Sequence, residues 1–223
     1  MNKTTAIAID GPSAAGKSTI ARALAQKLGF IYVDTGALYR SIGYYAHHRV
    51  SDTTDAAQVA PLLSEINIEM KYVDGLQRML LNGKDVTEEI RLPEMSMAAS
   101  NVSAIPAVRS FLLDLQRDLS KASNVVMDGR DIGTVVMPDA KIKFFLTATP
   151  EARARRRFLE FQAKGQAVDY EKILDETKQR DYNDMNRAAA PLCQADDAVL
   201  IDSTDLTFNE TLERMTAIIE ERL

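Results

Sequence analysis

Short apolar runs rich in β-branched and aromatic residues recur along the chain, and helical patterns separate most of them. The runs lie at residues 7–9, 30–33, 125–127, 142–146 and 199–201. This alternation predicts an α/β fold with a parallel β-sheet core flanked by helices. Between the first two runs, apolar residues repeat at helical spacing over 19–28 and stop at Gly29, which predicts a helix that ends there. A last helix is predicted from about Phe208 onward.

One segment breaks this alternation with a different pattern. Residues 66–86 contain short alternating runs that are punctuated by Asp74-Gly75 and Asn82-Gly83, dipeptides typical of hairpin turns. We therefore predict a small antiparallel insertion that lies outside the main sheet.

The composition limits the class of protein. A chain of 223 residues with 46% hydrophobic content can bury a sizeable core. Its single cysteine, Cys193, excludes an intramolecular disulfide and fits a reducing, cytoplasmic compartment. We expect no membrane association, because no apolar stretch approaches the length of a span and the N-terminus lacks the apolar region of a signal peptide. A net charge of −5 argues against nucleic-acid binding, so an anionic ligand should be held by local arginine clusters.

The strongest motif follows the first predicted strand. The segment GPSAAGKS at residues 11–18 fits the phosphate-binding pattern G-x-x-x-x-G-K-[ST], with a strand before it and a helix after it as the pattern requires. In that geometry backbone N–H groups point at phosphate oxygens, Lys17 reaches the β- and γ-phosphates, and the Ser18 hydroxyl can bind Mg²⁺. The predicted ATP-binding residues are Gly11, Pro12, Ser13, Ala14, Ala15, Gly16, Lys17, Ser18 and Thr19.

Charged residues also follow two other predicted strands, at the edge where open α/β sheets bind ligands. Asp128 has the placement of a Walker-B carboxylate that would hold Mg²⁺ directly or through water, and the alternative is a simple Asp-Gly turn. Arg130 and Asp131 follow it, either in the site or as a surface ion pair. After the second strand, Asp34 can cap a helix, while Arg40 can present its fork to a phosphate or lie in solvent.

A strongly basic helix is predicted over 150–164. Its arginines fall within five residues: Arg153, Arg155, Arg156 and Arg157. Spacings of three and four residues place Arg153, Arg156 and Arg157 on one face of the helix. They form either a solvated or polyanion-binding face, or a mobile lid whose arginines neutralise charge on a transferred phosphoryl group. Arg180, Asp184 and Arg187 form a similar line on the next predicted helix, where a surface salt-bridge ladder is the alternative.

Taken in chain order, these segments resemble the bacterial cytidylate kinases. The resemblance runs from the first strand to about Thr204 and rests on GPSAAGKST, DTGALYR, DGRDIGTVV, ARRR, QRDYNDMNR, AAAPL and VLIDST. It implies a single P-loop NTPase kinase domain over 1–223, with a small antiparallel NMP-binding insertion over about 62–100 and a helical lid over about 150–168. It also implies transfer of the γ-phosphoryl group of ATP, with Mg²⁺, to CMP or dCMP in pyrimidine nucleotide metabolism.

The resemblance implies roles for individual residues. Ser100, Arg109 and Asp131 are expected at the cytosine. Arg40, Arg130 and Arg187 are expected at the acceptor phosphate, with Arg180 and Asp184 at the sugar and Thr35 also in the CMP site. The expected catalytic residues are Lys17, Arg130, Arg153, Arg156 and Arg157, and the Mg²⁺ ligands are Ser18 and Asp128. Arg155 occupies a variable lid position and receives no role.

One departure from the family pattern concerns backbone conformation. Ala14 stands where the family commonly has glycine, which calls into question any left-handed conformation at that position.

The residue types are consistent with a kinase whose acceptor is a phosphate, because such an acceptor is largely ionised at pH 7 and needs no general base. A carboxylate such as Asp131 can accept from the cytosine N4 amino group.

Two other functions compete with this interpretation. A P-loop kinase of a small hydroxylated metabolite would need Asp34 or Asp131 as its base or positioning group. A nucleotide-gated switch would bind ATP or GTP without a second substrate, although we find no GTPase-type base-specificity motif. We expect a monomer that acts on free nucleotides.

Overall fold

The computed structural model describes residues 4–73 and 76–223, and the chain divides into two compact units. The core unit consists of Met1–Tyr32 and Ala122–Leu223, and the inserted unit is Val33–Lys121. No helix within the described ranges has the length and apolar character that a bilayer crossing requires.

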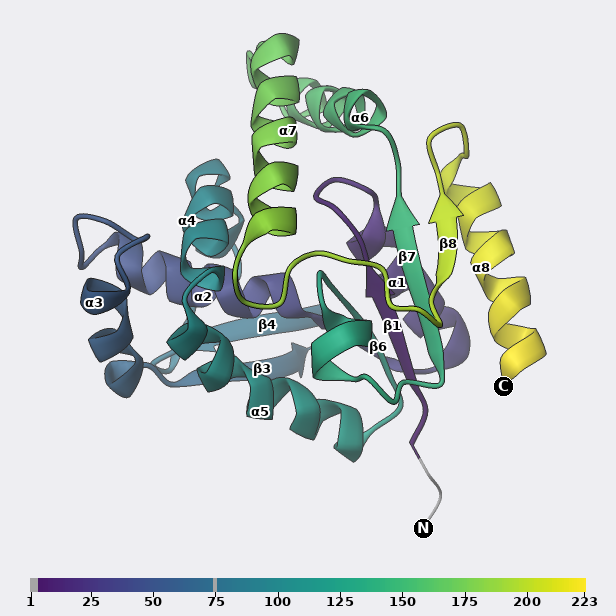
Figure 1. Cartoon of the computed structure of the whole chain (residues 1–223), viewed down its shortest axis with the longest axis horizontal. Helices are drawn as coiled ribbons and strands as arrows, with labels where there is room; N and C mark the ends of the chain where they lie inside the picture. Colours follow the sequence, from purple (N-terminus) through teal and green to yellow (C-terminus); the bar gives the residue numbers. More distant parts are fainter. Residues whose placement is uncertain (1–3, 74–75) are drawn as a thin grey trace. The chain divides into compact units, whose positions relative to one another are not determined.

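A five-stranded sheet with strand order β2-β6-β1-β7-β8 forms the centre of the core unit, although Val33 and Asp34 at the end of β2 are assigned to the inserted unit. Its strands are β1 (Ala6–Asp10), β2 (Ile31–Asp34), β6 (Val125–Gly129), β7 (Ile142–Thr147) and β8 (Val199–Asp202). β1 pairs in parallel with β6 and β7, and β7 pairs in parallel with β8 (Figure 1). All five predicted runs overlap these strands, so the parallel α/β core is confirmed.

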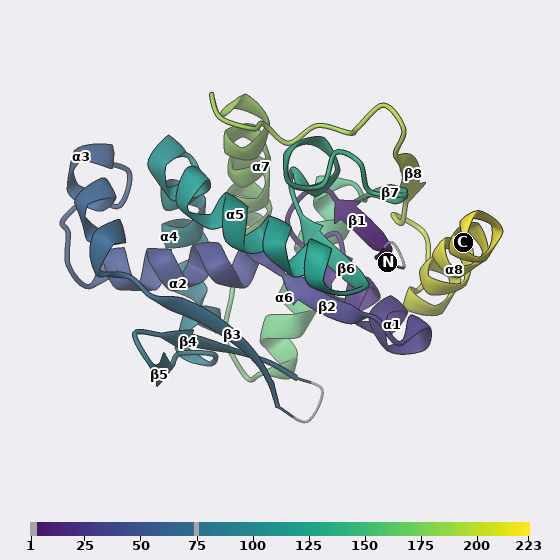
Figure 2. The ribbon, with the colours of Figure 1, turned by 90° about the horizontal axis from the view of Figure 1, so that it is seen from below.

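Helices α1 (Lys17–Leu28) and α8 (Phe208–Arg222) lie side by side against this sheet (Figure 2). Their apolar faces join the strands in one buried cluster that includes Ile7, Ile9, Leu24, Phe144, Met215 and Ile219. Gly29 ends α1 in the left-handed conformation with φ 67°, as its position in the sequence predicts. Thr207 and Glu210 form a capping box that starts α8. These contacts hold the start of α1, and so the phosphate loop before it, on the rigid sheet.

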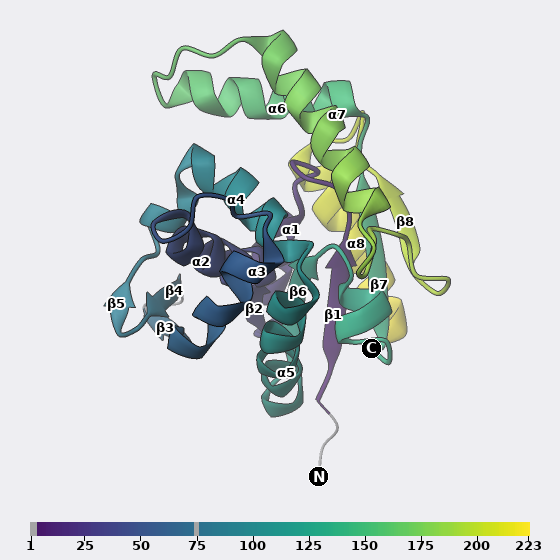
Figure 3. The same cartoon turned by 60° about the vertical axis from the view of Figure 1, so that its left-hand side comes forward.

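Three further helical elements complete the core unit. They are a turn of π-helix (Ile132–Val136) after β6, α6 (Pro150–Ala163) and α7 (Tyr170–Asn186). Pro150 occupies the first turn of α6, and Thr149 caps it by accepting from the Ala152 N–H. α6 and α7 contact each other (Figure 3), and a small cluster around Ala154, Ile173 and Leu174 is buried between them. The predicted basic helix is therefore confirmed.

The inserted unit contains helices and a separate sheet of order β3-β4-β5. The strands are β3 (Ile68–Val73), β4 (Leu76–Leu81) and β5 (Lys84–Asp85). The helices are α2 (Thr35–His47), α3 (Ala56–Val59), α4 (Pro93–Ser103) and α5 (Pro106–Ala122), with short 3₁₀ turns at Ala60–Glu65 and Glu89–Arg91. Ala122, the last residue of α5, belongs to the core unit. The predicted insertion, 62–100, falls within this unit, and its role in binding a nucleotide stays a prediction.

The antiparallel hairpins predicted for this segment are confirmed. β3 pairs antiparallel with β4, and β4 with β5. Between β4 and β5, Asn82 and Gly83 both have positive φ, at 50° and 80°, and Leu81 is the register partner of Lys84. These are the features of a two-residue type I′ turn. The other predicted turn, Asp74-Gly75, lies outside the described residues.

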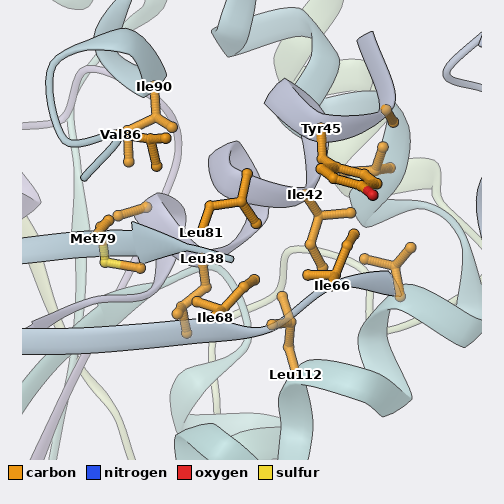
Figure 4. Close-up of a cluster of buried hydrophobic side chains, with 14 of the residues drawn as sticks. Leu38, Ile42, Tyr45, Ile66, Ile68, Met79, Leu81, Val86, Ile90 and Leu112 are labelled. Atoms are coloured by element: carbon orange, nitrogen blue, oxygen red, sulfur yellow. The ribbon is translucent and has the colours of Figure 1, made fainter. Parts of the chain in front are cut away.

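The inserted unit has its own hydrophobic core (Figure 4). Leu38 and Ile42 of α2 lie beside side chains of the small sheet such as Ile68 and Leu81, and Tyr45 belongs to the same buried cluster. Gly43 lets α2 approach α4 closely, because a Cβ there would come within 2.9 Å of the Ala98 backbone. This packing fixes the start of α2, where several predicted site residues lie.

Candidate active site

The phosphate loop connects β1 to α1 through residues with unusual backbone angles. Gly11 has φ 147°, and a Cβ there would lie 1.9 Å from the Leu146 carbonyl oxygen on β7, so only glycine fits. Gly16 has φ 91°. Ala14 has φ 59°, so it adopts the left-handed conformation that its Cβ disfavours. The departure from the family pattern therefore falls on a position that does require positive φ.

Lys17 is buried within this loop. Its Nζ donates to the Pro12 carbonyl at 2.6 Å, and its residue is 5% exposed. Burial, together with the positive charge of Arg130, holds the pKa of Lys17 well below its ordinary value, although Asp128, Asp184 and Asp10 act in the other direction. An ammonium group in this position can interact with phosphates that enter the loop.

Asp128 lies at the end of β6 directly beside the loop. Its Oδ2 accepts from the Ser18 hydroxyl at 2.9 Å, and its Oδ1 accepts from the Tyr32 hydroxyl at 2.8 Å. The predicted partners Ser18 and Asp128 are therefore brought together across 110 residues of sequence. The sequence pattern does not single out Tyr32, whose only signal is its position on the second strand.

Asp10 is a second buried carboxylate that sequence analysis missed. It ends β1, is 4% exposed, and accepts from the Ile132 and Gly133 N–H groups at 2.8 and 2.7 Å. Burial raises its pKa to about 6 in spite of these two hydrogen bonds. Asp10 thus fixes the π-helical turn that follows Asp128, Arg130 and Asp131.

The charged residues after β6 form ion pairs with those at the end of α7. Arg130 Nε donates to Asp184 Oδ2 at 2.8 Å, and Arg187 Nη2 lies 3.7 Å from Asp131 Oδ1. Burial raises the pKa of Asp184, but Arg130, Arg180 and Arg187 outweigh it and bring the pKa below its ordinary value. The structure therefore brings these five predicted residues together in the core unit.

Arg187 differs from its prediction in one respect. α7 ends at Asn186, and Arg187 has extended backbone angles, so the predicted helical line of three residues is wrong at its last member. The turn that follows the helix lets Arg187 Nε donate to the Ala190 carbonyl at 2.7 Å.

The basic helix α6 places its arginines in different surroundings. Arg153 is buried and binds the Ala148 and Ser13 carbonyls and the Asp181 carboxylate. Arg156 donates to the backbone carbonyl and the hydroxyl of Ser203, the latter at 3.2 Å. The Arg157 guanidinium lies 5.4 Å from the centre of the Phe161 ring. Arg155 is exposed.

The inserted unit holds the other four predicted CMP residues. Thr35 is buried at the start of α2. Arg40 pairs with Asp34 at 2.8 Å, while Asp34 also caps α2 by accepting from the Ala37 N–H at 2.9 Å. Arg109 donates to the Ser103 carbonyl at 3.3 Å and lies 5.6 Å from the Tyr39 ring centre. Ser100 is half-buried on α4, where its carbonyl accepts from the Ser103 hydroxyl.

Fold and site together define the class. A glycine-rich loop leads from β1 into α1, a carboxylate at the end of β6 binds the loop serine, and the sheet is parallel: this is a P-loop phosphotransferase. The family model for cytidylate kinase matches residues 7–221, and the chain belongs to the cytidylate kinase family of nucleoside monophosphate kinases.

Individual relatives agree with this assignment. The chain is 54% identical over 209 residues to a cytidylate kinase of Caldicellulosiruptor saccharolyticus, covering 94% of this chain and 92% of the relative. It is 47% identical over 222 residues to a cytidylate kinase of Syntrophotalea carbinolica, covering 100% of this chain and 94% of the relative. An uncharacterized protein of Eubacterium ventriosum, known from a crystal structure, shares the fold with a TM-score of 0.52 and 17% identity, covering 99% of this chain and 100% of that one.

Proposed function

We propose that this chain transfers the γ-phosphoryl group of ATP to CMP or dCMP and releases ADP with CDP or dCDP. The observation that carries the proposal is the ion-paired cluster at the end of β6 and α7, in which Arg130 binds Asp184 and Arg187 faces Asp131. It provides guanidinium groups for an anionic acceptor and a buried carboxylate for a base with an amino group.

Each group of residues has a part in this reaction. The loop 11–19 binds the phosphates of ATP through its N–H groups and Lys17. Arg130 and Arg187, with Arg40 of the inserted unit, bind the acceptor phosphate. Asp131, Ser100 and Arg109 bind cytosine, and Thr35, Arg180 and Asp184 complete the CMP site. Arg153, Arg156 and Arg157 belong to the lid.

The residues beside the loop fit a magnesium ion. Ser18 Oγ and Asp128 Oδ2 lie 2.9 Å apart at the end of β6, and both are hard oxygen donors. Mg²⁺ in phosphotransferases takes one or two such protein oxygens and fills its remaining positions with water and phosphate. When bound, the ion neutralises charge on the β- and γ-phosphate oxygens. Ser18 and Asp128 would hold it.

The same geometry disfavours a kinase that acts on an alcohol. Such an enzyme needs a base or a positioning group for the hydroxyl of its acceptor, and Asp34 or Asp131 would have to serve. Both oxygens of Asp34 already bind groups of their own helix, the Ala37 N–H and Arg40. The carboxylate of Asp131 faces the guanidinium group of Arg187 at 3.7 Å, so it too has a partner within the protein. A phosphate acceptor needs no such base.

A coupled assay tests the proposal. ADP release from ATP and Mg²⁺ is followed with CMP, dCMP, UMP, AMP, GMP, shikimate and gluconate as separate acceptors. Multiple turnovers with CMP and dCMP are expected. Turnover with shikimate or gluconate alone would support an alcohol kinase, and nucleotide binding without acceptor-dependent ADP release would support a switch. The single cysteine leads us to expect a cytoplasmic protein, and the net charge of −5 leads us to expect no nucleic-acid binding. That the chain acts as a monomer stays a prediction.

A further inference from the structure

The phosphate loop contains one peptide plane under strain. Ala14 has φ 59°, a conformation that costs an L-residue with a Cβ roughly five- to thirtyfold in population. A rotation of the Ser13–Ala14 peptide by about 180° would change ψ of Ser13 and carry φ of Ala14 to about −120°, a value within the range of φ that L-residues adopt. Some interaction must therefore hold this peptide in its observed orientation.

The hydrogen bond that holds it comes from α6. Arg153 Nη1 donates to the Ser13 carbonyl at 3.0 Å. In a planar trans peptide the carbonyl oxygen and the following N–H point in opposite directions. A contact that fixes the Ser13 carbonyl on one side therefore fixes the Ala14 N–H on the other. That N–H is one of the loop donors available to phosphate oxygens.

Hydrogen bonds within the protein engage most of the Arg153 guanidinium group. Its Nε donates to the Ala148 carbonyl at 2.9 Å, while Nη1 and Nη2 both donate to the carboxylate of Asp181 on α7. With Ser13 included, four of the five guanidinium N–H groups are engaged. The residue is 2% exposed. This commitment distinguishes Arg153 from Arg156 and Arg157, which are partly exposed.

We propose that Arg153 and Asp181 form a brace that holds the Ser13–Ala14 peptide in its phosphate-binding orientation, and that Asp181 is a positioning residue for the nucleotide. Asp181 does not contact the loop itself; it orients the guanidinium that does. The brace matters in this chain because Ala14, unlike glycine, has an intrinsic preference for the rotated peptide. The inference rests on nucleotide binding by the loop, which is part of the proposed function.

The test combines two substitutions in the full chain. Binding of Mg·ADP is measured by calorimetry for wild type, Asp181→Asn, Ala14→Gly and the double variant. Asp181→Asn should weaken ADP binding about five- to thirtyfold, because the strained peptide is then free to rotate. In the Ala14→Gly background the same substitution should cost less than about threefold, because glycine accepts positive φ without penalty.

A matched control separates this effect from general damage to the helix pair. Glu151→Gln removes a carboxylate that also joins α6 to α7, through Lys178 at 3.5 Å, but it does not touch Arg153. It should leave ADP affinity unchanged. If Asp181→Asn does not fold, Arg153→Lys replaces it, because lysine keeps the charge but lacks the fork that reaches Asp181 and Ser13 together.

The outcomes are distinct. Rescue of ADP binding by Ala14→Gly supports the brace, since a loss of general structure would not be repaired by one glycine in the loop. Equal losses in both backgrounds, or no loss with Asp181→Asn, overturn the brace while leaving the proposed function intact. Failure of the wild-type chain to bind Mg·ADP would overturn the proposed function and the brace together.

Discussion

At the scale of single residues, Lys17 combines a buried charge with a contact to its own loop. Its Nζ donates to the Pro12 carbonyl and has Asp128, Asp184 and Asp10 among its electrostatic partners. An ammonium group in this position costs folding free energy through desolvation, which is tolerated where the charge serves a ligand. Entering phosphates would replace the carbonyl as its partner.

Replacing Lys17 by alanine should therefore affect catalysis far more than folding. We expect kcat with ATP and CMP to fall on the order of 10²-fold or more, by analogy with the loss of one preorganised donor. The melting temperature should change little, because a desolvated charge is removed together with its hydrogen bond. Lys27→Ala is the matched control, since Lys27 lies on the same helix but is exposed and pairs with Glu220 at 4.0 Å. Near-wild-type turnover of Lys17→Ala would contradict the assignment of the loop.

Asp131 is predicted to read the acceptor base, so its substitution should change selectivity as well as rate. A carboxylate accepts from the cytosine N4 amino group and repels the O4 carbonyl of uracil, while an amide can present either a donor or an acceptor. A charge-assisted hydrogen bond is worth about 1.5 to 3 kcal/mol, so Asp131→Asn should reduce the preference for CMP over UMP by roughly 10- to 200-fold.

The ratio of kcat/KM values for CMP and UMP is the measurement, because Asp131 also faces Arg187 at 3.7 Å and its loss could lower both rates. Asp139→Asn, at an exposed position after the π-helical turn, is the control. Equal losses on both substrates would give Asp131 a structural role.

At the scale of elements, the arginines of α6 divide into two kinds. Arg153 is buried, with four of its five guanidinium N–H groups bound, whereas Arg156 and Arg157 are partly exposed. Arg156 binds Ser203, and Arg157 lies near the ring of Phe161. Guanidinium groups with such replaceable partners can move to a phosphoryl group when a lid closes.

Arg156→Ala or Arg157→Ala should lower kcat with little change in ATP affinity, because an interaction made only on closure stabilises the transition state selectively. At least one of the two should behave in this way in steady-state assays paired with ATP-binding measurements. Arg155→Ala, one helix position away and exposed, is the control. If both variants keep full kcat and instead lose affinity for a polyanion such as heparin, α6 is a basic patch and not a lid.

The same scale shows what sequence patterns can and cannot predict. Apolar runs, Gly29 as a helix stop and the Asn82-Gly83 turn predicted the strands, α1 and a hairpin, because these signals act over a few residues. The ion pair of Arg130 with Asp184 spans 54 residues, and the Asp10 contact with Gly133 spans 123. Such partners depend on how the elements pack. The roles of Asp10 and Asp181 therefore emerged only from the structure.

At the scale of the whole molecule, each compact unit has its own hydrophobic core, and the predicted site residues are distributed between the two units. The core unit contains the phosphate loop, Asp128 and the cluster at the end of α7. The inserted unit contains Thr35, Arg40, Ser100 and Arg109. The separate cores mean that stability measurements need probes of both units before a single unfolding free energy is assigned.

The free energy of unfolding should depend on pH through the ionisation of Asp10. Its folded pKa of about 6 lies above the value near 4 that an exposed aspartate has in an unfolded chain. Between these two values the folded state binds more protons than the unfolded state, so the free energy of unfolding decreases as pH rises from 4 to 6. Above the folded pKa, ionisation of the buried Asp10 carboxyl lowers the free energy of unfolding by about 3 kcal/mol. Below pH 4 this destabilisation is absent.

Asp10→Asn removes this titration while keeping the side-chain size. The variant loses an acceptor for one of the two backbone N–H groups of Ile132 and Gly133, which costs about 1 to 3 kcal/mol at every pH. Its stability relative to wild type should nevertheless improve by about 3 kcal/mol between pH 4 and pH 7, because only the wild-type chain must ionise a buried carboxylate. Urea unfolding at a series of pH values, with the exposed Asp205→Asn variant as control, measures this difference. A difference between Asp10→Asn and wild type that stays constant across this range would mean that Asp10 ionises in the folded protein as readily as in water.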